Sequence, residues 1–79
     1  MPELILYSSR YCPFCMKVLR YLRSESISVK IKDTMENPSA RQELASATGR
    51  TQVPCLFIDG NPLFESNDII QWFKENYND

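Results

Sequence analysis

The chain has 79 residues, of which 43% are hydrophobic and 24% charged, and its formal net charge is −1. This length predicts one small domain over residues 1–79, with the composition of a soluble globular protein. The near-neutral charge argues against a nucleic-acid-binding surface, and no apolar run approaches the roughly 20 residues of a membrane-spanning helix.

The first half of the chain predicts a strand, a helix and a second strand. Leu4–Tyr7 is a short β-rich apolar run, typical of a strand buried on both faces. Helical spacing of apolar residues follows, and Pro13 suits the first helical turn, which places Cys12 at the N-cap. The apolar residues of this helix are Cys15, Val18, Leu19 and Leu22. Residues 27–32 then alternate apolar and polar, which predicts a half-buried strand.

The middle of the chain predicts a helix followed by a β-hairpin. Asn37-Pro38 combines a capping residue with a first-turn proline, and Gly49 ends the helix that they begin. The apolar run 53–58 predicts a strand, and Asp59-Gly60 is a hairpin turn signal that leads into a return strand at 63–64.

A last helix completes the predicted fold. Ser66 is a candidate cap for it, and its apolar residues are Ile69, Ile70, Phe73 and Tyr77. The order β-α-β-α-β-β-α implies two parallel strands joined by a right-handed crossover, with an antiparallel pair added. The simplest packing is a four-stranded mixed sheet flanked by helices. Ligands bind such sheets beyond the carboxyl ends of the parallel strands, where Cys12 is expected.

Two cysteines spaced C-x-x-C are the strongest chemical signal. At a helix N-terminus, free N–H groups and the helix dipole favour the thiolate form of Cys12, and Arg10 and Lys17 are candidates for added positive potential. Cys15, one turn further on, is expected to be less exposed. This asymmetry suits thiol–disulfide exchange, in which Cys12 attacks and Cys15 resolves the mixed disulfide.

Zinc binding and a purely structural thiol pair are the alternatives for the same motif. A closed zinc site needs four ligands as a rule, whereas the chain has no histidine and only one further cysteine, Cys55. We therefore expect no metal ligand among these residues. A structural pair would leave Cys12 buried, but its predicted position is exposed. Cys55, directly after Pro54 in an apolar strand, is expected in the core.

Three segments together resemble the glutaredoxin family: YCPFC after the first strand, TQVPCLFIDG after the second helix, and ESNDII at the last helix. The resemblance covers nearly the whole chain. It implies a thioredoxin-like fold and thiol–disulfide oxidoreductase activity through Cys12 and Cys15. It also implies glutathione as co-substrate, with no tightly bound cofactor. Val53-Pro54 resembles the family segment that carries a cis-proline facing the dithiol.

The same resemblance implies a glutathione groove. The Val53 backbone would pair with the cysteinyl part of glutathione, Ser66 and Asn67 would hold its γ-glutamyl carboxylate, and Arg41 its glycyl carboxylate. The complete set of implied substrate-binding residues is Tyr11, Arg41, Gln52, Val53, Pro54, Glu65, Ser66 and Asn67.

The chain departs from the family pattern at two places. Ser9 occupies a position where the family often has a lysine, and Phe64-Glu65 replaces a Gly-Gly pair. Glu65-Ser66 instead resembles the E-S pair in the amino-terminal domain of glutathione transferases, where it holds the γ-glutamyl end of glutathione.

The leading hypothesis is a glutathione-dependent oxidoreductase that reduces protein disulfides and glutathione mixed disulfides. The alternatives are an electron donor recharged by thioredoxin reductase and a [2Fe–2S] carrier built from two chains and two glutathiones. The expected partners are glutathione and disulfide-bonded or glutathionylated proteins, with no nucleic acid and no membrane. MPELILY lacks the features of a signal peptide, so we expect a cytoplasmic monomer.

Two surface features of the predicted first helix have no role in that scheme. Phe14 lies between the cysteines, where an exposed apolar side chain would help protein substrates to dock. Lys17, Arg20 and Arg23 form a basic stripe, which is either a solvated face or a surface that steers acidic partners.

Overall fold

The computed structural model describes residues 2–77 and has the predicted order of elements. They are β1 (Leu4–Ser8), α1 (Pro13–Ser24), β2 (Lys30–Asp33), α2 (Pro38–Thr48), β3 (Cys55–Ile58), β4 (Asn61–Phe64) and α3 (Ser66–Asn76). Among these residues, no helix has the length and apolar character needed to cross a membrane.

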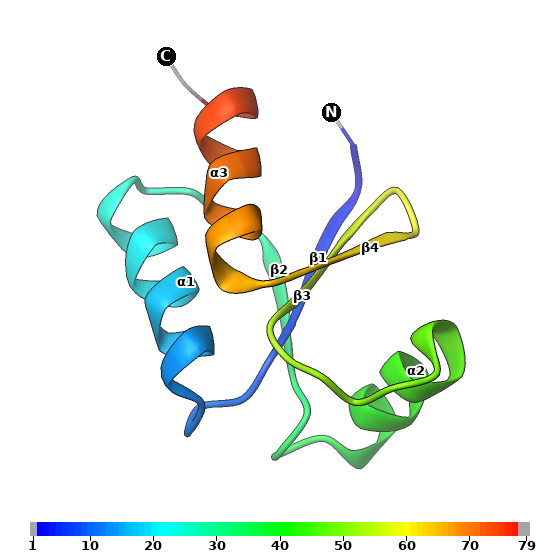
Figure 1. The fold of residues 1–79 in the computed structure, drawn as a ribbon. Helices are drawn as coiled ribbons and strands as arrows, with labels where there is room; N and C mark the ends of the chain where they lie inside the picture. The colour runs from blue at the N-terminus through cyan, green and yellow to red at the C-terminus, as the bar shows by residue number, and fades with distance from the viewer. Residues whose placement is uncertain (1, 78–79) are drawn as a thin grey trace.

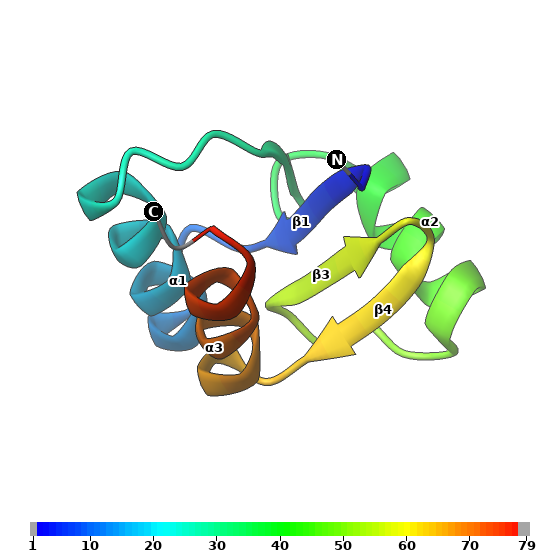
Figure 2. The same ribbon diagram turned by 90° about the horizontal axis from the view of Figure 1, so that it is seen from above.

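The sheet has the strand order β2-β1-β3-β4. β1 and β2 are parallel, whereas β1 pairs with β3, and β3 with β4, in antiparallel fashion. Figures 1 and 2 show α1 and α3 side by side on one face of this sheet and α2 on the other. The predicted four-stranded mixed sheet flanked by helices is therefore confirmed.

The sheet separates two hydrophobic clusters. Because successive side chains of a strand point to opposite faces, Leu6 and Leu56 face α1 and α3, whereas their neighbours Tyr7 and Cys55 face α2. The buried members of the first cluster are Leu6, Val18, Leu22, Leu56, Ile69 and Phe73. Those of the second are Tyr7, Ala40, Leu44 and Cys55.

Local signals explain where α2 begins and ends and where the hairpin turns. The side chain of Asn37 accepts a hydrogen bond from the Ser39 N–H at 3.0 Å, which caps the helix. Gly49 ends α2 with φ of +79°, a conformation that glycine adopts without steric cost. Asp59 and Gly60 both have positive φ, 50° and 86°, as a tight two-residue hairpin requires.

Several predicted element boundaries were wrong. The strand expected over 53–58 begins at Cys55, and the return strand expected at 63–64 begins at Asn61. β2 begins at Lys30 rather than at Ile27, because Ile27 lies in the loop after α1, where its N–H donates to the Leu22 carbonyl at 2.9 Å. Ile31, predicted to be half-buried, is 48% exposed on this edge strand. At α3 the N-cap is Glu65, with φ of +74°, and Ser66 is the first helical residue.

Candidate active site

The two cysteines of the C-x-x-C motif lie at the start of α1. Cys12 is the N-cap residue, as predicted, and Pro13 occupies the first helical turn. The side chain of Cys12 is partly exposed, whereas Cys15 is completely buried. Neither forms a disulfide in this structure. The motif therefore presents one accessible thiol with a second thiol directly behind it.

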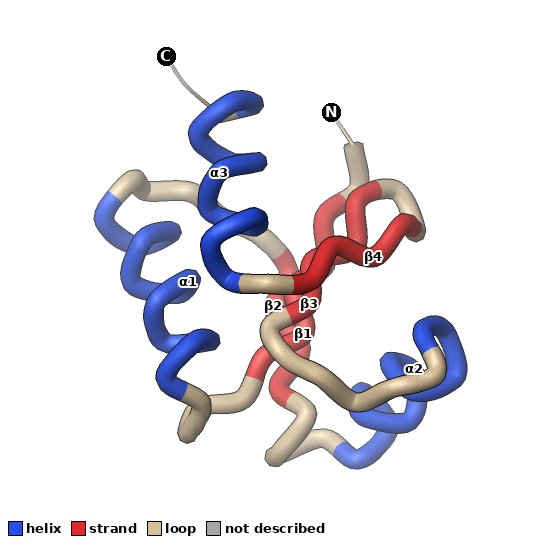
Figure 3. The backbone as a smooth tube through the Cα atoms, viewed as in Figure 1, coloured by secondary structure: helices blue, strands red, loops and turns tan. Residues whose placement is uncertain are grey.

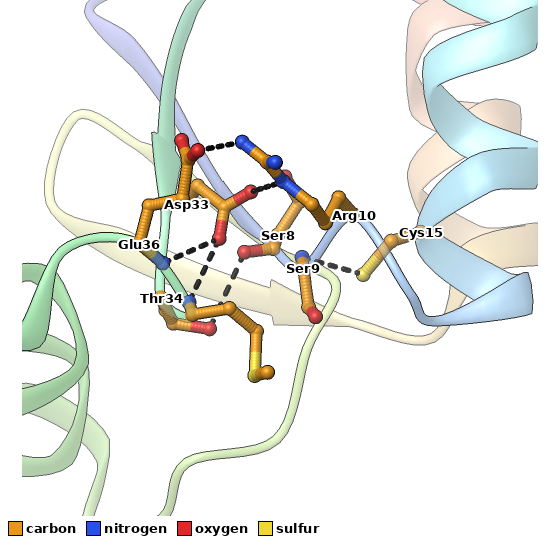
Figure 4. Close-up of polar contacts among 8 residues, drawn as sticks. Ser8, Ser9, Arg10, Cys15, Asp33, Thr34 and Glu36 are labelled. Atoms are coloured by element: carbon orange, nitrogen blue, oxygen red, sulfur yellow. Dashed lines mark hydrogen bonds and ion pairs between the residues drawn. The ribbon is translucent and has the colours of Figure 1, made fainter.

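Burial controls the chemistry of Cys15. Loss of solvent, with a smaller contribution from the neighbouring Cys12, raises the pKa of the Cys15 thiol from its ordinary value to about 12. One interaction opposes this shift, because the Ser9 backbone N–H donates to Cys15 Sγ at 3.3 Å (Figure 4). Cys15 is thus a protonated thiol at neutral pH, which suits a residue that acts after Cys12.

A cavity of about 370 Å³ lies next to Cys12. Cys12 Sγ is 4.0 Å from the carbonyl oxygen of Val53, and the Val53–Pro54 peptide bond is cis. Figure 3 shows the loop that carries this bond, which runs from the end of α2 to the start of β3. The residues that line the cavity are Phe14, Gln52, Val53, Pro54, Glu65, Ser66 and Asn67.

Polar contacts connect the cavity lining with its surroundings. Gln52 donates through Nε2 to the Glu65 carboxylate at 3.1 Å, and it accepts from Arg50 Nη1 at 3.1 Å. The Arg50 guanidinium lies over the Phe64 ring, 4.7 Å from its centroid. These contacts join the loop before β3 to the N-terminus of α3 and hold a carboxylate at the cavity.

Most of the predicted substrate-binding residues gather at this cavity, but two do not line it. Tyr11 is 75% exposed beside Cys12, and Arg41 is exposed on α2. Sequence reasoning did not place Phe14 in the groove, although its position between the cysteines was noted. It also missed that Lys17 Nζ donates to Asn67 Oδ1 and so connects α1 with α3.

Arg10, a candidate for added positive potential at Cys12, forms ion pairs elsewhere. Its side chain forms ion pairs with Asp33, at 3.6 Å, and with Glu36 (Figure 4). Asp33 also accepts hydrogen bonds from two backbone N–H groups of the loop before α2. Arg10 therefore ties the loop after β1 to the loop after β2, and its charge is compensated there. These contacts correct the expectation that Arg10 adds positive potential at Cys12.

Cys55 is a core residue, as predicted. It is completely buried on the α2 face of the sheet, and burial raises the pKa of its thiol to about 11. Within residues 2–77 no three histidine, cysteine, aspartate or glutamate side chains cluster as potential metal ligands.

Comparisons with known proteins agree with this arrangement. The model of a family described as Glutaredoxin matches residues 4–63. The chain is 35% identical over 74 residues to the chloroplastic Glutaredoxin-C4 of Oryza sativa subsp. japonica, covering 89% of this chain and 55% of that protein. It therefore spans about half the length of that relative. It is 29% identical over 69 residues to Glutaredoxin 3 of Escherichia coli strain K12, covering 87% of this chain and 83% of that protein.

A solved structure supports the same fold. The crystal structure of the holo form of glutaredoxin C1 from Populus tremula x tremuloides superimposes with a TM-score of 0.69 and 28% sequence identity. The match covers 96% of this chain and 76% of that chain. The fold is therefore thioredoxin-like.

Proposed function

This chain belongs to the glutaredoxin family, and we propose that it reduces protein disulfides and glutathione mixed disulfides through Cys12 and Cys15, with glutathione as co-substrate. The observation that carries the proposal is the placement of Cys12. It combines a partly exposed position at the N-terminus of α1, a neighbouring cavity and a buried second thiol.

The first step is attack by the Cys12 thiolate on a substrate disulfide. A bond forms between Cys12 Sγ and one substrate sulfur, and the other substrate sulfur leaves as a thiolate that takes up a proton. The free N–H groups at the start of α1 favour the attacking thiolate. With a glutathionylated protein, attack on the glutathione sulfur releases the protein thiol and leaves glutathione on Cys12.

The mixed disulfide is then resolved in one of two ways. A glutathione thiolate attacks the glutathione sulfur on Cys12, giving oxidised glutathione and the Cys12 thiolate. Alternatively, Cys15 loses its proton and attacks Cys12 Sγ, which forms the Cys12–Cys15 disulfide and releases the bound thiol. Two glutathione molecules then reduce that disulfide and supply the two electrons.

The cavity beside Cys12 is the proposed glutathione groove. Its volume of about 370 Å³ lies within the usual range for small-molecule sites. Ser66 and Asn67, at the N-terminus of α3, are proposed to bind the γ-glutamyl carboxylate through free N–H groups. The Val53 backbone is proposed to pair with the cysteinyl part. Arg41 and Tyr11 do not line the cavity, so their contribution is a proposal that rests on the family resemblance alone.

We expect no tightly bound cofactor, and we expect the partners to be glutathione and disulfide-bonded or glutathionylated proteins. A reducing compartment such as the cytoplasm is consistent with three free cysteines in a redox protein.

A turnover assay tests the proposal. The substrate is a glutathionylated peptide, and the reductant is either glutathione with glutathione reductase or thioredoxin reductase. We expect turnover with glutathione, and no turnover by Cys12→Ser. Turnover with thioredoxin reductase alone would contradict glutathione dependence and favour the alternative electron donor.

A binding experiment tests the groove separately. Glutathione is titrated into Cys12→Ser protein, and amide NMR shifts are followed. We expect shifts at residues 52–54 and 65–67. No shifts at millimolar glutathione would contradict the groove. Loss of affinity in Arg41→Gln would show that Arg41 contributes to binding.

A further inference from the structure

An aromatic residue and three basic residues form one row along the exposed side of α1. Phe14, Lys17, Arg20 and Arg23 recur every third residue, and all four are exposed. Residues at this spacing form a continuous ridge on a helix surface. We call Lys17, Arg20 and Arg23 the basic ridge. Between Phe14 and Arg23 the helix rises about 13 Å and turns through a net half revolution, so the row crosses the exposed side of α1 diagonally as it leads away from the dithiol.

The charge of the basic ridge is not compensated within its own helix. Three of the nine basic residues of the chain lie in α1, whereas all ten acidic residues lie outside it. The ion pairs among residues 2–77 involve Arg10 and Lys32, and none includes a residue of α1. Within the described part of the chain, the polar partner of Lys17 is the neutral amide of Asn67. The ridge is therefore a local positive surface on a chain with a net charge of −1.

The end of this row next to the dithiol is apolar. Phe14 is 63% exposed and also lines the cavity beside Cys12. Its position connects the reacting sulfur with the basic ridge, because Lys17 follows one turn later and contacts Asn67 of the same cavity. A substrate segment that leaves Cys12 along α1 would meet an aromatic ring first and positive charge after it.

We propose that α1 docks an acidic segment of the protein substrate, with an apolar substrate side chain on Phe14 and carboxylates along the basic ridge. This inference rests on the proposed disulfide exchange at Cys12. The helix rises about 7 Å from Cys12 to Lys17 and about 16 Å from Cys12 to Arg23. At about 3.3 Å per extended residue, the carboxylates belong roughly two to five positions from the reacting cysteine.

Acidic protein is favoured over other anionic partners by the size of the patch. Three cations on an otherwise acidic chain provide little of the multiple phosphate contact on which nucleic-acid binding depends. A few exposed charges of one sign are well suited to orient a protein segment and to raise its association rate.

Two glutathionylated peptides of equal length test the proposal. Both carry leucine next to the cysteine. One has glutamate from the second to the fifth following position, and the other has glutamine there. Hydroxyethyl disulfide, with glutathione, measures the exchange reaction without docking. The variants are Arg20→Gln/Arg23→Gln, the charge reversal Arg20→Glu/Arg23→Glu, and Lys74→Gln as the matched control. Lys74 is an exposed basic residue in the last turn of α3.

We expect the wild-type protein to prefer the glutamate peptide, with kcat/KM about fivefold above that for the glutamine peptide. The double neutralisation should remove this preference, the charge reversal should invert it, and Lys74→Gln should keep it. Raising the salt from about 0.05 M to about 0.5 M should also remove it. Equal use of both peptides by the wild-type protein, or equal loss on both peptides in the variants, would overturn the docking proposal.

A binding measurement separates this inference from the proposed function. The glutamate peptide, with serine in place of its cysteine, is titrated into Cys12→Ser protein, and amide shifts are expected along α1. Shifts without turnover of any disulfide would overturn the proposed function and support the docking surface. Turnover of hydroxyethyl disulfide without shifts on α1 would support the proposed function and overturn the docking surface.

Discussion

Closure of the Cys12–Cys15 disulfide should become steadily faster as the pH rises from 6 to 10. Only the thiolate of Cys15 can attack Cys12. Because burial raises the pKa of Cys15 to about 12, about one Cys15 in 100,000 is ionised at pH 7. Each pH unit then multiplies the thiolate population roughly tenfold. In the mixed disulfide the effect of Cys12 on this pKa changes, but burial, the largest cause, persists.

A single-turnover experiment measures this dependence. Reduced protein is mixed with a glutathionylated peptide in the absence of free glutathione, quenched with acid, and analysed by mass for the mixed and the internal disulfide. The initial rate of closure should increase tenfold per pH unit without levelling off. Resolution of the same mixed disulfide by glutathione in Cys15→Ser should level off above about pH 8.5, the ordinary value for a thiol. A plateau for internal closure near that pH would show that burial does not control Cys15 and would refute the reasoning.

Four further outcomes are expected. Cys12→Ser should lose exchange with all disulfides while its circular dichroism is unchanged, and residual turnover would point to another nucleophile. Arg10→Gln should lower the melting temperature by a few degrees, since it breaks exposed ion pairs, and change Cys12 alkylation less than about twofold. The pKa of Glu43 is held below its ordinary 4.5 by hydrogen bonds from Lys32 and Tyr7, so the stability it contributes is present above that pH and lost as pH falls through the folded value. The melting-temperature gap between wild type and Glu43→Gln should accordingly close on acidification, and a gap that widens would contradict this sign. Leu56→Ala should cost about 2–5 kcal/mol in a denaturant titration, because it empties a fully buried site.

The parts of the fold that were predicted correctly depend on local causes. Asn37 caps α2 with its own side chain, Gly49 ends it at positive φ, and Asp59-Gly60 turns the hairpin. In each case a residue type and its neighbours along the chain are sufficient to specify the backbone. The helical spacing of apolar residues in α1 and α3 likewise follows directly from which side faces the sheet.

The boundaries that were predicted wrongly depend on partners distant in sequence. The alternation at residues 27–32 is typical of a strand, but pairing with β1 begins only at Lys30. Ile27 and Val29 instead pack against the core from the preceding loop. Serine is a common N-cap, yet the chain enters α3 through Glu65 at positive φ, and Ser66 is buried inside the first turn.

In the candidate site, too, features with local causes were predicted correctly and features that depend on distant partners were not. The C-x-x-C spacing and Pro13 were sufficient to predict an accessible Cys12 and a buried Cys15. The direction of the Arg10 side chain was not predictable, because Asp33 and Glu36 reach it from another loop. The contact of Lys17 with Asn67 likewise depends on how α1 lies beside α3.

The position of Cys55 on the far face of the sheet restricts how this chain can be oxidised. Its sulfur lies among Tyr7, Ala40 and Leu44, with the sheet between it and α1. A native chain therefore has one reachable internal pairing, and scrambled isomers that involve Cys55 require the domain to open first. Labelling of Cys55 by a thiol reagent therefore measures the unfolded fraction of the protein. It does so independently of the redox state of Cys12 and Cys15.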